Sequence, residues 1–319
     1  MRTTNLSATF ALLSLLALLA QEAWAEVKIG IFMFSEETRY VEAVRGVKER
    51  LAVAGFGEPK TSYFVEKAGA NKARAVELVK KFAAQKLDLI VSVGTSATAV
   101  LSRDIKDVPI VFTMVYDPVE AGITHSWQSS GNNTTGSSPL IPMSKLLDSL
   151  KKFAPVKRLA VLYTPAEKNS ESQLKDLQEI QAKYQVKVVP VRLTKKEEIG
   201  QLLPEVLRSV DALYITGSNL VNSQVLPIVE MATKAKVVTI THLEDLVSKG
   251  VLLGVCADPY AVGVLAGDKA VKILKGAKPA SLPISTSPKS DILLNMKTVK
   301  RGAFAVPPEF MDSVTKNIE

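Results

Sequence analysis

The sequence predicts an α/β protein made of two doubly wound parallel-sheet lobes. Three observations lead to this prediction. Short apolar strand patterns alternate with helical patterns along almost the whole chain, as in parallel sheets covered by helices. The alternation stops once, at a stretch rich in Ser, Gly, Asn and Pro at 127–142 that reads as a connection, and then restarts. The 319-residue chain is long enough for two domains of about 100–200 residues each.

The first 25 residues have the pattern of a secretory signal peptide. Arg2 supplies a positive charge, the stretch 8–20 is almost wholly apolar, and Ala23 and Ala25 form an A-x-A cleavage site. The apolar stretch is too short for a membrane-spanning helix, which needs about 20 apolar residues. The residue directly after the cleavage site is Glu26, not a Cys that could accept a lipid. We therefore expect export, cleavage after Ala25 and a soluble mature protein.

Four strands are expected before the connection. Their ranges are 27–34, 61–65, 87–93 and 109–115. Helical spacing follows the first of them, in a segment that Gly55 ends, and a second helix is expected at 73–84. Each strand is thus followed by a helix or by a polar loop, which is the pattern of a doubly wound sheet.

The same alternation continues after the connection. Strands are expected at 159–163, 186–191, 212–216, 237–240, 251–255 and 292–294. Helices are expected at 146–153, around 174–184, before Val210, before Ala235 and at 260–274. No period of 20–50 residues recurs, which excludes a solenoid.

Composition excludes several classes of function. The net charge is +8, but Lys and Arg stand beside Glu in helices and form no basic run with interleaved aromatics, so we expect no nucleic-acid partner. Cys256 is the only cysteine, which excludes an internal disulfide and a zinc cluster of Cys ligands. His125 and His242 have no metal-ligand spacing. We expect neither a metal nor a cofactor.

Candidate site residues should follow the strands, because ligands bind at the carboxyl ends of strands in doubly wound sheets. This criterion selects the loops 35–38, 94–96, 116–117, 163–164, 216–219, 241–244 and 257–260. Gly94-Thr95-Ser96 precedes an Ala-rich helix, where free N–H groups can bind a carboxylate or simply be capped. Asp117 and Asp258 both precede Pro, and each either shapes a turn or presents its carboxylate to an ammonium group.

A series of motifs in one order extends over essentially all of the chain after residue 25. It includes Gly94-Thr95-Ser96, Tyr116-Asp117-Pro118, the segments 131–136 and 161–170, and Asp258-Pro259-Tyr260. In this order they resemble the ABC-transporter substrate-binding family that includes tryptophan- and tyrosine-type uptake proteins. The resemblance implies a type I periplasmic-binding-protein fold with two lobes joined by a hinge. It divides the chain into a first lobe at 26–117 with a return segment at 258–289, a second lobe at 118–257, and a tail at 290–319 that it does not assign to a lobe.

The resemblance also implies ligand contacts. Thr95 and Ser96 would bind a ligand carboxylate, and Asp117 and Asp258, at crossings between lobes, could hold its ammonium group. The opposite lobe would contribute Tyr163, Asn169, Ser170 and Asn219. Three further candidates come from the strand-end loops, namely Ser35, Tyr116 and His242. Aromatic residues near these strand ends suit an apolar or aromatic ligand side chain.

The function implied is that of a monomeric periplasmic protein of an ABC importer. It would bind an amino acid between its lobes, present it to a permease in the inner membrane and catalyse no reaction. Two alternatives remain open, a ligand sensor that docks on a membrane receptor and an exported serine hydrolase. The hydrolase would use Ser96, His242 and Asp258, but the G-x-S-x-G pattern of a nucleophile elbow is broken at 94–98.

Overall fold

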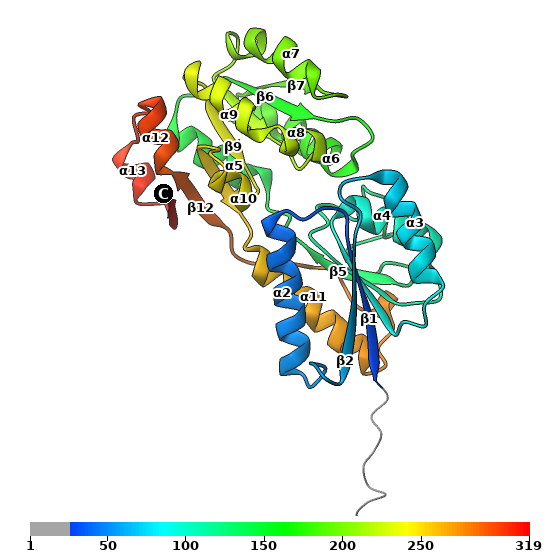
Figure 1. Ribbon diagram of the computed structural model, residues 1–319. Coiled ribbons are helices and arrows are strands. Elements are labelled where there is room, and N and C mark those ends of the chain that lie inside the picture. The colour runs from blue at the N-terminus through cyan, green and yellow to red at the C-terminus, as the bar shows by residue number, and fades with distance from the viewer. Residues whose placement is uncertain (1–25) are drawn as a thin grey trace, which may run out of the picture.

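The computed structural model describes residues 26–319, which form two α/β lobes (Figure 1). The leader expected at 1–25 lies outside the described residues. Each lobe has one sheet with helices on both faces, which confirms the predicted fold class. Within residues 26–319, none of the helices has the length and apolar character needed to cross a bilayer.

The first lobe has a six-stranded parallel sheet. Its strands are β1 (Val27–Met33), β2 (Thr61–Lys67), β3 (Leu89–Val93), β4 (Ile110–Thr113), β5 (Thr134–Ser138) and β11 (Ser285–Thr286), in the order β11-β5-β4-β3-β1-β2. Helices α2 (Thr38–Val53) and α11 (Pro259–Leu274) cover one face, and α3 (Lys72–Ala83) and α4 (Thr95–Asp104) cover the other (Figure 1). Alternation along β1 explains both layers. Ile29 and Ile31 pack with side chains of α2 and α11, whereas Phe32 packs with Phe82 of α3.

The second lobe has a seven-stranded sheet. Its strands are β6 (Arg158–Tyr163), β7 (Lys187–Arg192), β8 (Ala212–Ile215), β9 (Val238–Thr241), β10 (Leu253–Cys256), β12 (Asp291–Asn295) and β13 (Lys316–Ile318), in the order β13-β12-β10-β9-β8-β6-β7. Only β12 and β13 oppose the common direction, because β12 pairs antiparallel with β10.

Helices cover both faces of this second sheet as well. Helices α5 (Met143–Phe153) and α6 (Lys168–Tyr184) pack on one face, and α7 (Glu197–Leu207) and α9 (Val225–Lys234) pack on the other. Four short helices complete the lobe, α8 (Asn219–Ser223), α10 (Glu244–Ser248), α12 (Met296–Gly302) and α13 (Pro308–Met311).

The lobe boundaries differ from the prediction at one place. The stretch 127–142 was expected to be a connection, but it contains β5, which pairs in parallel with β4. The first lobe therefore extends to residue 138 instead of 117, and Asp117 lies inside that lobe instead of at a crossing. Within residues 26–319, the chain crosses between the lobes at 139–142, 257–258 and 287–290, and the tail joins the second lobe through β12 and β13.

Candidate functional site

The loops that meet between the lobes come from equivalent positions in the two sheets. The central strand order is β2-β1-β3-β4-β5 in the first sheet and β7-β6-β8-β9-β10 in the second. An order of this kind reverses once, between β1 and β3 and between β6 and β8, and leaves a crevice at the carboxyl ends of those strands. The loops after these four strands therefore form the facing walls of a candidate site at the lobe junction.

The first-lobe wall is formed by the starts of α2 and α4. Gly94 has a φ of 88°, and a Cβ at this position would lie 2.7 Å from Tyr40 Oη. Glycine at 94 therefore permits both the turn before α4 and the close approach of Tyr40. Thr95, the first residue of α4, is buried and lines a cavity between the lobes. No side chain among the described residues caps the N-terminus of α4, where the helix dipole favours negative charge.

One face of α6 forms the second-lobe wall. Asn169 and Gln173 are four residues apart, so they lie on the same side of the helix. The backbone of Gly217, just after β8, holds both side chains. Its N–H donates to Gln173 Oε1 at 2.8 Å, and its carbonyl accepts from Asn169 Nδ2 at 2.6 Å. All three residues line the same cavity as Thr95.

His242 follows β9 and lies at the centre of a buried polar network. Its Nδ1 is 2.7 Å from Tyr214 Oη, and its Nε2 is 3.2 Å from Gln173 Nε2. Burial and the nearby charge of Arg39 lower the pKa of His242 to about 3, so its ring is neutral at physiological pH. Tyr116 of the first lobe packs edge-on against this ring, with the ring centroids 5.4 Å apart.

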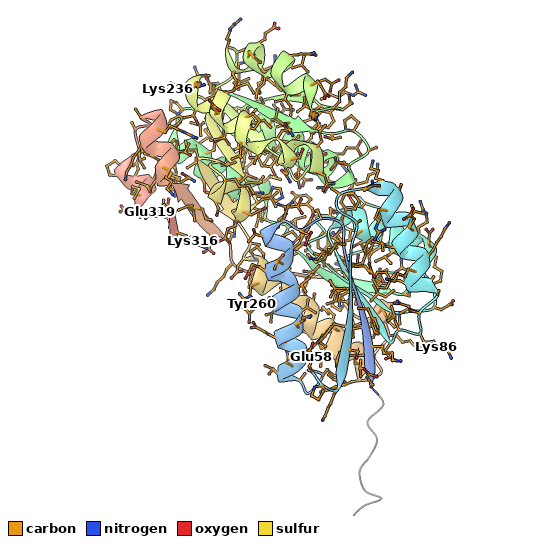
Figure 2. All side chains as sticks on the ribbon, in the orientation of Figure 1. Glu58, Lys86, Lys236, Tyr260, Lys316 and Glu319 are labelled. Carbon is orange, nitrogen blue, oxygen red and sulfur yellow. The ribbon has the colours of Figure 1, made fainter. Side chains whose placement is uncertain are left out.

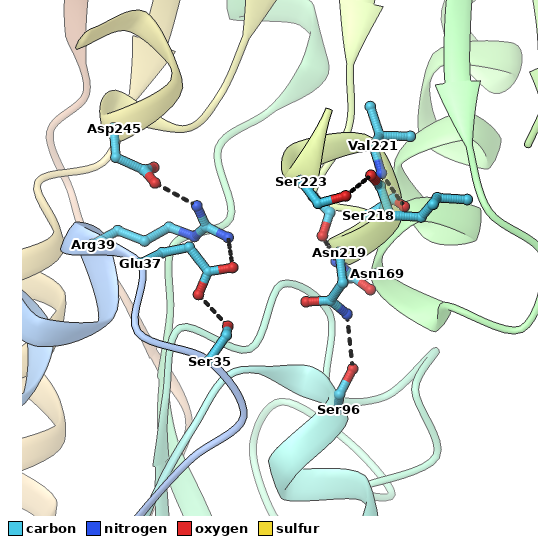
Figure 3. Close-up of polar contacts among 12 residues, drawn as sticks. Ser35, Glu37, Arg39, Ser96, Asn169, Ser218, Asn219, Val221, Ser223 and Asp245 are labelled. Carbon is cyan, nitrogen blue, oxygen red and sulfur yellow. Dashed lines mark hydrogen bonds and ion pairs between the residues drawn. The ribbon is translucent and has the colours of Figure 1, made fainter. Parts of the chain in front are cut away.

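A buried ion pair crosses between the lobes beside the cavity (Figure 3). Arg39 Nη1 from α2 lies 2.7 Å from Asp245 Oδ2 from α10, and the two side chains are only 3% and 4% exposed. Glu37 adds a second carboxylate 3.6 Å from Arg39 Nη2. Burial by itself lowers the pKa of Arg39, but the negative charges around it, Asp245 foremost, more than offset this and raise the pKa. Asp245 Oδ1 is buried and has no hydrogen-bond partner among residues 26–319.

The cavity between these walls has a volume of only about 20 Å³. It is lined by Arg39, Tyr40, Thr95, Met114, Tyr116, Pro139, Asn169, Gln173, Gly217, His242 and Leu243. Pockets that hold small molecules usually measure about 300–1,000 Å³. The lobes are therefore closed against each other around this cavity, and a ligand of amino-acid size can enter it only when they separate.

Six of the predicted site residues lie at this junction. Thr95, Tyr116, Asn169 and His242 line the cavity. Ser96 and Asn219 join the lobes directly, because Asn219 Nδ2 donates to Ser96 Oγ at 3.3 Å (Figure 3). Glu167 Oε2 orients Asn219 by accepting from its backbone N–H at 2.7 Å and from its Nδ2 at 2.9 Å.

The two aspartates expected to hold an ammonium group lie outside the lining of this cavity, although Asp258 lines the second cavity described below. Asp117 Oδ1 accepts from the backbone N–H groups of Val119 and Glu120 at 2.9 and 3.0 Å. Asp258 Oδ1 accepts from the N–H of Tyr260 at 2.8 Å and caps the start of α11. Through Oδ1, Asp117 therefore shapes a turn and Asp258 caps a helix, which is the alternative role expected for each of them.

Ser35, Tyr163 and Ser170 also lie outside the cavity lining. Ser170 Oγ donates to the carbonyls of Thr164 and Glu167, both at 3.0 Å, and so orders the loop after β6. Ser35 Oγ donates to Glu37, the second carboxylate beside Arg39. Tyr163 packs against the apolar core.

The three residues of the hydrolase alternative do not form a catalytic relay. Ser96 Oγ accepts from Asn219, the His242 ring contacts Tyr214 and Gln173, and Asp258 caps α11. A proton relay requires the nucleophile and the base to be within hydrogen-bond reach of each other. Here Ser96 and His242 form their hydrogen bonds with other side chains instead.

Sequence reasoning missed Arg39, Asp245 and Gln173. Arg39 and Asp245 each lie one residue beyond a selected strand-end loop, on the first turn of the helix that follows. Gln173 lies one turn after Asn169, and Asp176 continues the same stripe. Polar residues at i, i+4 and i+7 on a helix against the sheet were a signal that could have identified this face.

A second cavity, of about 270 Å³, lies where both lobes meet the crossing at Asp258. Arg39 lines both cavities and so separates them. Figure 2 shows two of the lining residues, Tyr260 on the first lobe and Lys316 on the second. Much of its charge is paired within the wall, as between Arg45 and Glu42 at 2.6 Å.

Two doubly wound lobes that close over a polar cavity define a two-lobed solute-binding protein. The chain belongs to the ABC transporter substrate-binding protein family, whose family model matches residues 28–317 and confirms the resemblance seen in the sequence. A curated relative, the tyrosine-binding protein of Clostridioides difficile (strain R20291), is 28% identical over 274 residues, which cover 85% of this chain and 79% of that protein.

Solved structures share the fold of this chain. An ABC domain from Streptococcus pneumoniae in complex with L-Trp is 24% identical, has a TM-score of 0.87 and matches 92% of this chain and 100% of its own. The ligand-free, open structure of a substrate-binding protein with adhesive properties from Clostridium difficile is 29% identical over the same shares, with a TM-score of 0.73.

Proposed function

We propose that this protein binds an aromatic amino acid between its lobes. The observation that carries the proposal is the cavity at the junction, whose walls combine aromatic rings with groups suited to both charges of an amino acid. Tyr40, Tyr116 and His242 offer ring surfaces for an aromatic side chain. The uncapped start of α4 at Thr95 suits a carboxylate, and Asn169 Oδ1 can accept from an ammonium group. The tyrosine-binding relative supports the same ligand class.

Binding would proceed by opening and closure of the lobes. A solute enters the open form and is then enclosed by both walls, so the closed form has the higher affinity and its population increases with ligand. The signal-peptide pattern at 1–25 supports a location in the periplasm. There the monomeric, liganded protein would deliver its solute to the permease of an ABC importer.

The proposal is tested by identifying what the protein carries. Native mass spectrometry of the purified protein should detect a retained aromatic amino acid, and calorimetry on protein refolded free of ligand should then show binding of L-Tyr or L-Trp. L-Glu and myo-inositol serve as controls for charged and polyol solutes and should give no binding heat. Binding of a polyol without any amino acid would refute the proposed ligand class.

A further inference from the structure

Gly217 fixes the orientation of the two side-chain amides that line the cavity from the second lobe. A backbone N–H can only donate and a carbonyl can only accept. Gln173 must therefore turn its Oε1 toward the Gly217 N–H, and Asn169 must turn its Nδ2 toward the Gly217 carbonyl. This leaves Gln173 Nε2 and Asn169 Oδ1 for other partners.

His242 uses one of the two hydrogens on Gln173 Nε2. Because an amide nitrogen donates, His242 Nε2 accepts across 3.2 Å, and the ring proton resides on Nδ1 and is donated to Tyr214 Oη at 2.7 Å. The low pKa of the buried ring keeps this arrangement at physiological pH, because a protonated ring would place an N–H against the amide N–H. One Gln173 N–H then remains unused, and Asn169 Oδ1 has no hydrogen-bond partner in the described part of the chain.

We propose that Gly217, through these two amides, sets the hydrogen-bond polarity of the second-lobe wall. Asn169 Oδ1 accepts from the ammonium group of the ligand, and the remaining Gln173 N–H donates to one oxygen of its carboxylate. The other carboxylate oxygen meets the start of α4, so that one ligand group is held by both lobes and favours their closure. This inference rests on the proposed function, because it assigns the two charged groups of an amino acid.

A side chain at 217 would disturb both amides. A Cβ there would lie 2.8 Å from Asn169 Nδ2 and 3.3 Å from Gln173 Nε2. The backbone at Gly217 lies outside the left-handed region, so alanine adds no backbone strain. The displaced atoms are the ends of side chains, which can move without unfolding the lobe. Alanine at 217 should therefore change ligand recognition and leave the fold intact.

The first experiment compares two glycine variants by calorimetry with L-Tyr and by thermal melting. We expect Gly217→Ala to weaken binding about tenfold or more, the scale of one hydrogen bond to a charged group, without a change in melting temperature. Gly200→Ala is the matched control, because nothing lies within 4 Å of a Cβ at this position in α7. Parent-like affinity of Gly217→Ala would overturn the inference.

The second experiment assigns each amide to one charged group of the ligand. Asn169→Leu and Gln173→Leu are titrated with L-Tyr, with tyramine, which lacks the carboxylate, and with 3-(4-hydroxyphenyl)propanoate, which lacks the ammonium group. We expect Asn169→Leu to weaken L-Tyr and tyramine but spare the propanoate, and Gln173→Leu to weaken L-Tyr and the propanoate but spare tyramine. L-Trp with tryptamine and indole-3-propanoate is the equivalent set.

The outcomes separate this inference from the proposed function. Equal loss of both analogues in either variant would indicate a structural role and contradict the assignment. Tight binding of L-Tyr or L-Trp by the parent, with unchanged variants, would overturn this inference and leave the proposed function standing. A parent that binds neither amino acid would overturn both.

Discussion

Replacement of Arg39 by Met tests whether the buried ion pair holds the lobes closed. The change removes the 2.7 Å cationic partner of the almost completely buried Asp245 and leaves it only the half-exposed Lys249 Nζ, 4.0 Å from its Oδ2. Its Oδ1 already lacks a hydrogen-bond partner among residues 26–319. Removal of one half of a buried pair costs about 3–5 kcal/mol. Arg39 and Asp245 belong to different lobes, so separation of the lobes gives the stranded carboxylate access to water. The cost should therefore fall on the closed form and spare the folding of each lobe.

The expected result is a more open protein with weaker ligand binding. At about 1.4 kcal/mol for each factor of ten, the lower end of this cost corresponds to an affinity loss of roughly 100-fold. Small-angle scattering without ligand should give a larger radius of gyration for Arg39→Met than for the parent, and calorimetry should give the weaker affinity. The double variant Arg39→Met/Asp245→Leu removes the stranded charge and should recover closure and most of the affinity.

A second ion pair between the lobes provides the control. Lys175 Nζ lies 2.7 Å from Glu120 Oε1, and both side chains are about half exposed. Because water replaces such a contact readily, Lys175→Met should leave the scattering and the affinity unchanged. If Arg39→Met scatters and binds like the parent, the pair does not control closure. If it melts far lower with unchanged scattering, the pair stabilises the fold and not the closed state.

Three further predictions follow from individual contacts. Asp117→Ala loses a turn contact and Asp258→Ala loses a helix cap, so each should cost about 1 kcal/mol of stability and keep ligand affinity. Calorimetry beside a thermal melt checks this, and weaker binding would return that residue to the ammonium site. Tyr116→Phe loses the 2.8 Å hydrogen bond to Asp176 across the lobes, and calorimetry should show about tenfold weaker binding. His242 has a pKa of about 3 in the folded protein and 6.5 in the unfolded chain, so between these pH values the unfolded state binds more protons. The free energy of unfolding therefore rises with pH in this window, by at most about 1.4 kcal/mol per pH unit. Urea unfolding at pH 4.5 and 7.5 should show a smaller pH dependence for His242→Asn than for the parent, and equal dependences would contradict a neutral native ring.

Most of the fold could be predicted because apolar periodicity reports burial. The strand expected at 27–34 is β1, and the helix expected at 260–274 is α11. The strand β5 was missed because its sequence, Thr-Thr-Gly-Ser-Ser, has no apolar alternation. Its side chains are buried through hydrogen bonds to distant segments, as from Ser137 Oγ to the Val262 carbonyl at 2.7 Å. Contacts with residues more than 100 positions away leave no local pattern in the sequence.

The candidate site was only partly predictable for a related reason. The strand-end rule located Thr95, Tyr116 and His242, because topology alone brings those loops together. It could not distinguish an aspartate that caps a helix from one that faces a ligand, because both uses favour Asp after a strand. Asp258 illustrates this, since only the structure shows that its Oδ1 accepts from backbone N–H groups and caps α11.

The contacts described between the lobes are mainly polar, apart from the packing of Tyr116 on His242, and this determines how easily a ligand can shift the open–closed equilibrium. Asn219 to Ser96 and Tyr116 to Asp176 are hydrogen bonds that water replaces when the lobes open. Such bonds contribute only about 0.5–1.5 kcal/mol each in net terms, and about twice that when one partner is charged. A ligand that adds a few contacts to both walls therefore supplies enough differential affinity to change the closed population severalfold or more. A large apolar interface would hold the lobes shut with or without solute, whereas polar contacts leave opening accessible and make closure depend on what the cavity contains.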